Sequence, residues 1–284
     1  MSDTANTDNK PNISAIIPTK NGHATIARAI RSMLNQTLVP SEILIISDND
    51  ISDPAGKIAS EELHAVIAAN FANESSSENA DARKGKIRII QGPSKGPGIA
   101  RNLGVEKATS DLIAFLDDDD IWSDEHKLEK QAAYLASHPD IDVVGAEMTF
   151  FIRENGEKFQ TIMQPTDSVA VRDQMLVRNP LITSSVLMRR RAFVEANGFK
   201  PMYLAEDYDL WLRMNRKRNR IANAPGTSIE YTVREGSASQ KRKVRMAYAV
   251  ASLVFKNVFF YPNKFAIVKA KWPIFKRLLA EKLR

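Results

Sequence analysis

The sequence predicts an α/β protein with an open, mostly parallel sheet and helices on its faces. Three observations predict this class. Short apolar runs alternate in the first half with segments of helical period. The 284 residues, 43% of them apolar, suffice for one large α/β domain or for a domain with an appendage. Polar clusters follow the apolar runs, where parallel strands would end at one edge of a sheet.

The first half contains the predicted strands of the parallel sheet. Short, continuous and β-branched runs are typical of strands that are buried on both faces. Because helical segments separate these runs, right-handed crossovers would place the strands parallel to one another. The runs are Ile13 to Ile17, Ile43 to Ile46, Ile87 to Ile90 and Leu112 to Leu116.

Three helices are expected between these strands. Pro97 to Ala108 predicts a short helix that begins after a glycine and proline-rich turn. A longer helical segment, around Ile58 to Phe71, precedes the polar stretch Asn73 to Lys86, which we expect to be a mobile surface loop. The first helix has its apolar residues on one face, namely Ile26, Ile30, Met33 and Leu34.

The second half loses the simple alternation. Strands are predicted at Val143-Val144, Met148 to Ile152, Ser184 to Met188 and Ile229 to Val233. A helix is predicted after Glu206, and its apolar residues are expected to face the core, including Leu210, Trp211 and Met214.

Composition excludes several classes of site. The chain has no cysteine, so it has no disulfide, thiolate nucleophile or cysteine-bound zinc. Its histidines lack metal-ligand spacing: His23, His64, His126 and His138. Residues 1–12 are polar, lack the pattern of a secretory signal and are predicted to be a disordered tail, so a cytoplasmic location is expected.

Much of the basic excess behind the net charge of +6 lies between Arg213 and Arg220 and in the C-terminal part, residues 241–284. Basic clusters alternate there with apolar and aromatic residues, which predicts a basic amphipathic helical extension. Such helices lie at anionic membrane surfaces, and this extension would place the protein at the inner face of the membrane. Packing of the same apolar residues on the main domain is equally compatible with the pattern. Nucleic-acid binding is not expected, because no reading motif is present.

The strongest local signal is four consecutive aspartates, Asp117 to Asp120, directly after an apolar strand. Mg²⁺ and Mn²⁺ prefer carboxylate oxygens and often complete their shell with phosphate oxygens. An acidic, solvated turn is the alternative for this run alone. Similar polar clusters follow the other strands, at Pro18 to Gly22, Ser47 to Asp50 and Gly92 to Gly98. Together at one sheet edge, these clusters predict a nucleotide site.

These residues resemble the family 2 glycosyltransferases, which have the GT-A fold. The resemblance implies a Rossmann-like mixed sheet flanked by helices over residues 13–240, with a helical C-terminal extension. Its motifs follow one another in order along the chain: Ser14 to Asn21, Leu34 to Thr37, Gly98 to Gly104, Phe115 to Trp122, Lys127 to Gln131, Gly198-Phe199 and Glu206 to Arg213.

The resemblance also implies roles for individual residues. Asp117 and Asp119 would bind a divalent cation, Mn²⁺ or Mg²⁺, and Asp120 would support them without contacting the cation directly. Asp207 would be the catalytic base. Asp48 would accept a hydrogen bond from uracil, and Asp118 would face the ribose. The residues assigned to donor binding are Pro18, Thr19, Asn21, Asp48, Gly98, Arg101, Asp117, Asp118 and Arg234.

Structural roles remain open for three of these residues. Asp48 could be an ordinary turn residue. Arg101 could anchor its helix to the acidic loop through an ion pair. Asp207 could stabilise the start of its helix. Arg234 stands where many relatives have a histidine, and its guanidinium could pair with the diphosphate.

The implied activity is inverting transfer of a sugar from a nucleotide-sugar donor, expected to be a UDP-sugar, to a saccharide or lipid-linked acceptor. Residues Phe151 to Leu181 would shape the acceptor pocket. Relatives of this length commonly act in bacterial surface polysaccharide synthesis. Two alternatives stay open: a nucleotidyltransferase, which would release pyrophosphate, and a non-catalytic module that binds nucleotides or glycans.

Overall fold

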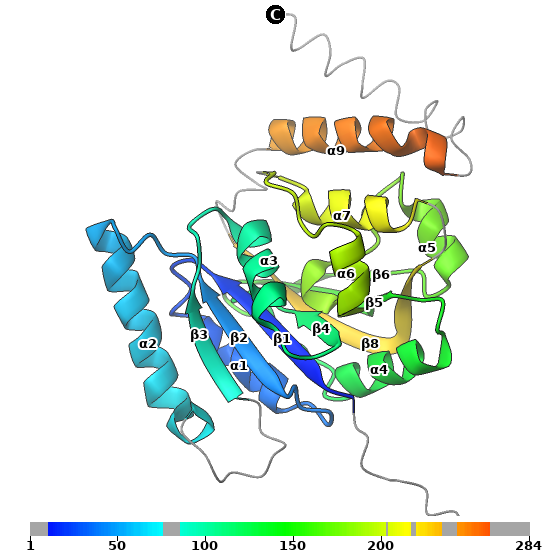
Figure 1. Ribbon diagram of the computed structural model, residues 1–284. Coiled ribbons are helices and arrows are strands. Elements are labelled where there is room, and N and C mark those ends of the chain that lie inside the picture. Colours follow the sequence, from blue (N-terminus) through cyan, green and yellow to red (C-terminus); the bar gives the residue numbers. More distant parts are fainter. Residues whose placement is uncertain (1–10, 76–85, 203, 217–219, 235–242, 262–284) are drawn as a thin grey trace, which may run out of the picture.

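The computed structural model describes residues 11–75, 86–202, 204–216, 220–234 and 243–261, and in these ranges eight strands form one mixed sheet (Figure 1). The predicted parallel part is confirmed. Its strands lie in the order β3-β2-β1-β4, and Ile16 of β1 is paired with Leu44 of β2 and Phe115 of β4. These strands are β1 (Ile13–Thr19), β2 (Glu42–Ser47), β3 (Lys86–Gln91) and β4 (Leu112–Phe115).

The three expected helices of the first half are present, and a fourth was not expected. The helices are α1 (Ile26–Leu34), α2 (Pro54–Ser75), α3 (Pro97–Lys107) and α4 (Lys127–Ser137). Helix α2 is longer than expected and bends at Phe71, where φ is −139°. The predicted surface loop, Asn73 to Lys86, is therefore shorter than expected at both ends: α2 continues to Ser75, and Lys86 already belongs to β3. The residues between them, 76–85, lie outside the described residues. Helix α4 buries an apolar face, formed by Leu128, Ala132 and Leu135.

Antiparallel pairing enters in the second half. β7 (Leu187–Arg189) lies between β4 and β5 (Val143–Arg153) and runs antiparallel to both. β5 continues as one strand through both predicted segments, pairs in parallel with β8 (Ile221–Val233), and pairs antiparallel with β6 (Lys158–Met163). β6 was not predicted, because its residues are nearly all exposed and form no apolar run.

Short elements connect these strands. They are α5 (Ser168–Gln174), the 3₁₀ turn η1 (Thr183–Ser185), α6 (Arg190–Glu195) and α7 (Glu206–Met214). The helix predicted after Glu206 is therefore confirmed as α7. Its inward residues Leu210, Trp211 and Met214 are buried, and Trp211 is a core residue. The N-terminal part of the predicted strand Ser184 to Met188 is instead the turn η1, so β7 begins only at Leu187.

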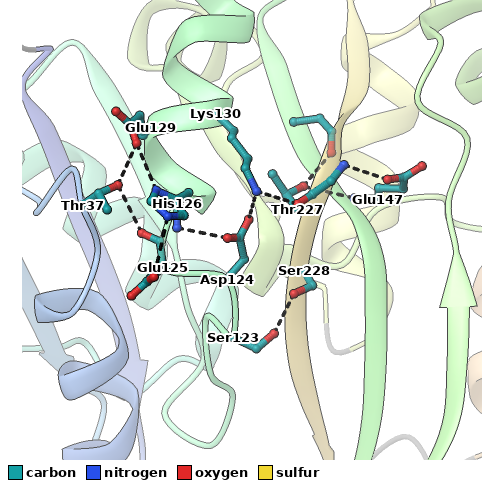
Figure 2. Close-up of polar contacts among 12 residues, drawn as sticks. Thr37, Ser123, Asp124, Glu125, His126, Glu129, Lys130, Glu147, Thr227 and Ser228 are labelled. Carbon is teal, nitrogen blue, oxygen red and sulfur yellow. Dashed lines mark hydrogen bonds and ion pairs between the residues drawn. The ribbon is translucent and has the colours of Figure 1, made fainter.

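The pairing of β5 with β8 shifts register between Ala146 and Met148. Lys130 of α4 supports this irregularity, because its Nζ donates to the Gly226 carbonyl at 2.8 Å and contacts Asp124 Oδ2 at 2.9 Å (Figure 2). The Gly226 N–H in turn donates to Glu147 Oε2 at 2.8 Å. α4 is therefore tied to both long strands.

Two apolar layers cover the sheet. Ile16 of β1 belongs to the layer that contains Phe115 and residues of α3, α6 and α7, while its neighbour Ile17 belongs to the layer of α1, α2 and α4. Helix α3 approaches β1 closely at Gly104, where a Cβ atom would lie 2.5 Å from Ile16 Cγ2. This close contact brings the start of α3 to the edge of the sheet where β1 ends.

The described part of the C-terminal extension packs on the main domain. It contains α9 (Lys243–Asn257) and η2 (Val258–Phe260). Leu253, Val258 and Tyr261 are buried, and the Tyr261 hydroxyl donates to the Leu212 carbonyl of α7 at 2.9 Å. Figure 1 shows α9 alongside α7. Residues 262–284 lie outside the described residues, as do residues 1–10 of the predicted disordered tail.

Across the residues that the structure describes, no helix combines the length and the apolar character needed to cross a bilayer.

Candidate active site

The polar clusters predicted at the strand ends come together at one edge of the sheet. They follow β1, β2, β3 and β4, and the end of β8 joins them through contacts with the aspartate quartet. Because β1 to β4 are parallel, their carboxyl ends necessarily share this edge. The start of α7 reaches the same place through Arg101.

At the predicted nucleotide corner, Asp48 is buried and anchors the loop that follows β3. Its Oδ2 accepts from the Gly96 N–H at 2.7 Å, and its Oδ1 accepts from the Lys95 N–H at 3.3 Å. The turn role is therefore present, and both oxygens already accept backbone hydrogen bonds. Pro18 is buried within β1 beside Ile46.

Asn21 occupies a strained position close to this corner. Its backbone is left-handed, with φ of 59°, and its N–H donates to Asn49 Oδ1 at 3.1 Å. Asn49 is itself buried, so it holds the loop after β1 against the end of β2. Asn49 belongs to the polar cluster Ser47 to Asp50, but nothing in the sequence singled it out.

In the aspartate quartet, the side chain of Asp118 is held by a residue at the end of β1. Thr19 Oγ1 donates to Asp118 Oδ2 at 2.5 Å. Gly22 makes room for this pair, since a Cβ atom there would lie 1.8 Å from Asp118 Oδ2. The predicted donor residues Thr19 and Asp118 are thus in direct contact.

Arg101 links the quartet to α7. Its guanidinium is buried, pairs with Asp117, and lies 3.8 Å from Glu206 Oε1. Burial alone would lower the pKa of Arg101, but the carboxylates of Asp117 and Glu206 outweigh it and the pKa is raised. The anchoring ion pair expected as the alternative for this arginine is present. Gly98 lies at the same junction, where an added Cβ atom would be 3.1 Å from Glu206 Cγ.

Arg234 reaches the quartet from the end of β8. Its Nε lies 2.6 Å from Asp119 Oδ2 and its Nη2 lies 3.4 Å from Asp118 Oδ1. Burial, followed by repulsion from Asp117 and Asp118, raises the pKa of Asp119 to about 7 despite this arginine. The single positive charge of Arg234 therefore offsets the charges of Asp118 and Asp119 only in part.

Asp120 faces the interior. It is buried, accepts from the Ser184 hydroxyl, and accepts from the Thr232 N–H at 2.8 Å. Burial and then the neighbouring Asp117 and Asp119 raise the pKa of Asp120 well above its usual value. Asp120 thus joins the loop after β4 to η1 and to β8.

Asp207 lies in the first turn of α7, after Ala205, whose backbone is left-handed with φ of 59°. Its Oδ1 accepts from the Tyr208 N–H at 2.7 Å, which is the helix-start contact proposed as an alternative role. Its Oδ2 accepts from Asn179 Nδ2 at 3.1 Å and from Thr183 Oγ1 at 3.4 Å. Burial is the main cause of the raised pKa of Asp207. A carboxyl group with a raised pKa, held in a defined orientation, is suited to accept a proton.

Asn179, Thr183, Ser184 and Thr232 were not predicted as site residues. Asn179 and Thr183 precede Asp207 by more than twenty residues and belong to no motif. Asn179 was noted only within the segment expected to shape an acceptor pocket. Their place beside the carboxylates depends on how β7 returns between β4 and β5.

The acidic loop suits a hard cation if substrate oxygens complete the shell. Asp117 and Asp119 supply carboxylate oxygens, and repulsion from Asp117 and Asp118 adds to the effect of burial in raising the pKa of Asp119. Among the described residues, no three His, Asp or Glu side chains are grouped so as to hold a metal ion unaided. The donor set therefore fits a cation shared with a phosphate group.

Residues 14–197, well over half of the chain, match the family model described as "Glycosyl transferase family 2". The chain belongs to this family. Its membership confirms the resemblance that the sequence motifs indicated. This glycosyltransferase is also 28% identical over 215 residues to the amylovoran biosynthesis glycosyltransferase AmsE of Erwinia amylovora, an alignment that covers 75% of this chain and 71% of AmsE.

Two solved structures show the fold of this glycosyltransferase. S. aureus TarS 1–349 in complex with UDP-GlcNAc superposes with a TM-score of 0.60 at 18% identity, covering 90% of this chain and 70% of the TarS 1–349 chain. GalNAc-T7 with UDP, GalNAc and Mn²⁺ gives a TM-score of 0.57 at 16% identity, covering 80% of this chain but only 45% of GalNAc-T7. The predicted GT-A fold is confirmed. The roles of individual residues stay predictions.

Proposed function

We propose that this glycosyltransferase moves a sugar, with inversion, from a UDP-sugar to a hydroxyl group of a saccharide or lipid-linked saccharide. The observation that carries the proposal is the bridge made by Arg101, which pairs with Asp117 and lies 3.8 Å from Glu206, the neighbour of Asp207. The acidic loop and the carboxyl group of Asp207 are therefore parts of one site.

Asp207 is the base in this proposal. Its Oδ2 is oriented by Asn179 and Thr183, and the acceptor hydroxyl would lose its proton to this carboxylate as the oxygen attacks the anomeric carbon. A single displacement with inversion needs no covalent intermediate. The bond to the donor phosphate breaks as the new glycosidic bond forms, and the nucleoside diphosphate leaves.

Arg101 and Arg234 would stabilise charge on the leaving diphosphate, because guanidinium groups make bidentate contacts with phosphate oxygens. Both arginines now face the carboxylates of Asp117, Asp118 and Asp119. A divalent cation held by Asp117 and Asp119 would supply Lewis-acid stabilisation of the same phosphates. A diphosphate would add negative charge beside Asp117, Asp118 and Asp119, whose carboxylates already outnumber the two arginines, and this favours a cation there.

The donor is proposed to be a UDP-sugar from the family resemblance and from the ligands of similar structures. Asp48, the residue expected to face uracil, lies at the nucleotide corner, where it also anchors the loop that follows β3. The structurally similar TarS was solved with UDP-GlcNAc, and GalNAc-T7 with UDP. The relative AmsE is an amylovoran biosynthesis enzyme, which supports a setting in bacterial polysaccharide synthesis.

Isothermal titration of UDP, GDP and TDP with Mn²⁺ tests the donor and the metal together. We expect selective binding of UDP that requires Mn²⁺ and is lost in Asp119→Ala. Asp140→Ala, an exposed aspartate outside the site, serves as the matched control. Equal UDP affinity in Asp119→Ala would refute the metal assignment. Failure of the folded wild-type protein to bind any of these nucleotides would refute the transferase proposal.

Release of UDP rather than pyrophosphate, measured with the donor that binds, separates this activity from nucleotidyl transfer.

A further inference from the structure

Three aromatic rings form a row across neighbouring strands beside the candidate active site. The ring centroids of Tyr231 on β8 and Phe151 on β5 lie 5.4 Å apart, and those of Phe151 and Phe159 on β6 lie 6.3 Å apart. The row follows from strand register, because Phe151 and Tyr231 are direct partners in the parallel pair of β5 and β8. We call these three residues the aromatic strip.

The aromatic strip is accessible to ligands. Phe159 is 43% exposed, and Phe151 and Tyr231 are partly exposed. A single exposed phenylalanine is common on protein surfaces, but a continuous row of rings is not. The tilts between neighbouring rings, 57° and 59°, are typical of favourable aromatic contacts, so the three rings pack on one another.

One end of the strip reaches the catalytic carboxylates. Tyr231 directly precedes Thr232, whose N–H donates to Asp120 and whose hydroxyl donates to the Asp119 carbonyl at 2.5 Å. Burial, followed by the carboxylates of Asp120, Asp117, Asp119 and Asp207, raises the pKa of the Tyr231 phenol. Tyr231 therefore lies within electrostatic reach of both the acidic loop and the proposed base.

The other end of the strip carries charged side chains. The Arg153 guanidinium lies 5.3 Å from the centre of the Phe159 ring and pairs with Glu157 at 3.7 Å. Both residues are largely exposed. Planar charged groups beside an aromatic ring offer hydrogen bonds to hydroxyl groups around an apolar face.

We propose that the aromatic strip is an acceptor subsite that stacks against the sugar rings of a saccharide, with the reacting sugar at Tyr231. The proposal rests on the proposed glycosyl transfer. The C–H faces of a sugar ring are apolar while its edge carries hydroxyl groups, and this matches rings that are flanked by polar side chains. A lipid chain fits less well, because it would cover Arg153 and Glu157 without giving them hydrogen bonds.

Saturation-transfer NMR with methyl glucoside, methyl galactoside, methyl N-acetylglucosaminide and the disaccharides cellobiose, lactose and chitobiose tests the strip in the presence of UDP and Mn²⁺. We expect at least one glycoside to bind through its ring protons. Phe159→Ala and Phe151→Ala should weaken that binding about fivefold or more, and Phe159→Trp should restore it. Ile58→Ala is the control, since Ile58 is 55% exposed on α2, beside β3 at the other end of the strand order.

The proposal is overturned if no glycoside binds to wild type, if the two alanine variants bind as wild type does, or if farnesyl phosphate binds the strip and the glycosides do not. UDP affinity is measured on every variant and should stay unchanged. Glycoside binding without UDP binding would refute the transferase proposal and leave the strip as a saccharide-binding surface rather than an acceptor subsite. UDP binding without glycoside binding would refute only the subsite.

Discussion

Two guanidinium groups and a larger number of carboxylates determine the electrostatics of the candidate site. Arg101 and Arg234 contact Asp117, Asp118 and Asp119, while Glu206 and Asp207 add further carboxyl groups on α7. Burial comes first among the causes that raise the pKa of Asp119, Glu206 and Asp207. Proton transfer and cation binding are both favoured by such a surplus of partly desolvated carboxylates.

Replacing the proposed base should separate chemistry from binding. Asp207→Asn keeps the shape of the side chain but cannot accept a proton, so turnover should fall about 10²- to 10⁴-fold while UDP affinity is retained. Steady-state kinetics and titration of UDP measure the two quantities. Asp173→Asn, an exposed residue on α5, is the control. Wild-type turnover in Asp207→Asn would mean that another group is the base.

The pH dependence of turnover should report on Thr183. Burial raises the pKa of Asp207, and the Thr183 hydroxyl opposes this effect by donating to the carboxylate. Thr183→Val removes the donor, so the pKa of Asp207 should rise further. Because the base acts when deprotonated, the acidic limb of the rate profile should move to higher pH, with the plateau rate little changed. An unmoved limb would show that Thr183 does not tune Asp207.

At the level of elements, one buried carboxylate connects the N-terminal ends of β1, β2 and β3 with the loop that precedes β4. Glu42, the first residue of β2, accepts from Ser14 of β1 at 2.6 Å and from the N–H and hydroxyl of Thr109, each at 2.7 Å. Arg88 of β3 lies 3.3 Å away. Burial would raise the pKa of Glu42, but these contacts outweigh it and the pKa is lowered.

Glu42→Gln should therefore destabilise the sheet in a pH-dependent way. A lowered pKa stabilises the fold above the unfolded value of 4.5, and this contribution is lost as pH falls through the folded pKa. At pH 7 the variant should lose about 1–3 kcal/mol of unfolding free energy. Urea denaturation at neutral and acidic pH measures the difference, with exposed Glu61→Gln as control. A difference that persists unchanged in acid would contradict the account.

Across the whole molecule, the described C-terminal segment, residues 243–261, has two different faces. Leu253, Val258 and Tyr261 pack against the domain, whereas Val244 is 56% exposed and Phe259 is 75% exposed. We propose that the outer face of this segment contacts a membrane surface. Basic residues near exposed apolar ones attract anionic lipid surfaces.

The full chain should co-sediment with vesicles that contain anionic lipid, and binding should weaken as salt rises. Neutral vesicles should bind much less, because the basic residues would lose their partner. Phe259→Ala should reduce binding, and Ile58→Ala should not. Equal binding of Phe259→Ala and wild type, or equal binding to neutral and anionic vesicles, would argue against a membrane role for this face.

Much of the site was predictable because its residues follow strands. Thr19, Asp118 and Arg234 were each predicted as donor residues, and the structure brings them into contact. Arg101 and Asp117 form the ion pair that was named as the structural alternative to donor binding by Arg101. The partners of Asp207 could not be predicted, since Asn179 and Thr183 approach it only through chain packing.

By itself the sequence determined the parallel strands, the edge where their polar ends meet, and the family. Apolar periodicity, strand length and motif order are local properties of the chain, so they can be read without knowing which segments meet. Only the tertiary structure decided the antiparallel insertion of β7, the exposed strand β6 and the aromatic strip. These depend on the register between distant strands, and no local pattern specifies which residue of β5 faces which residue of β8 or β6.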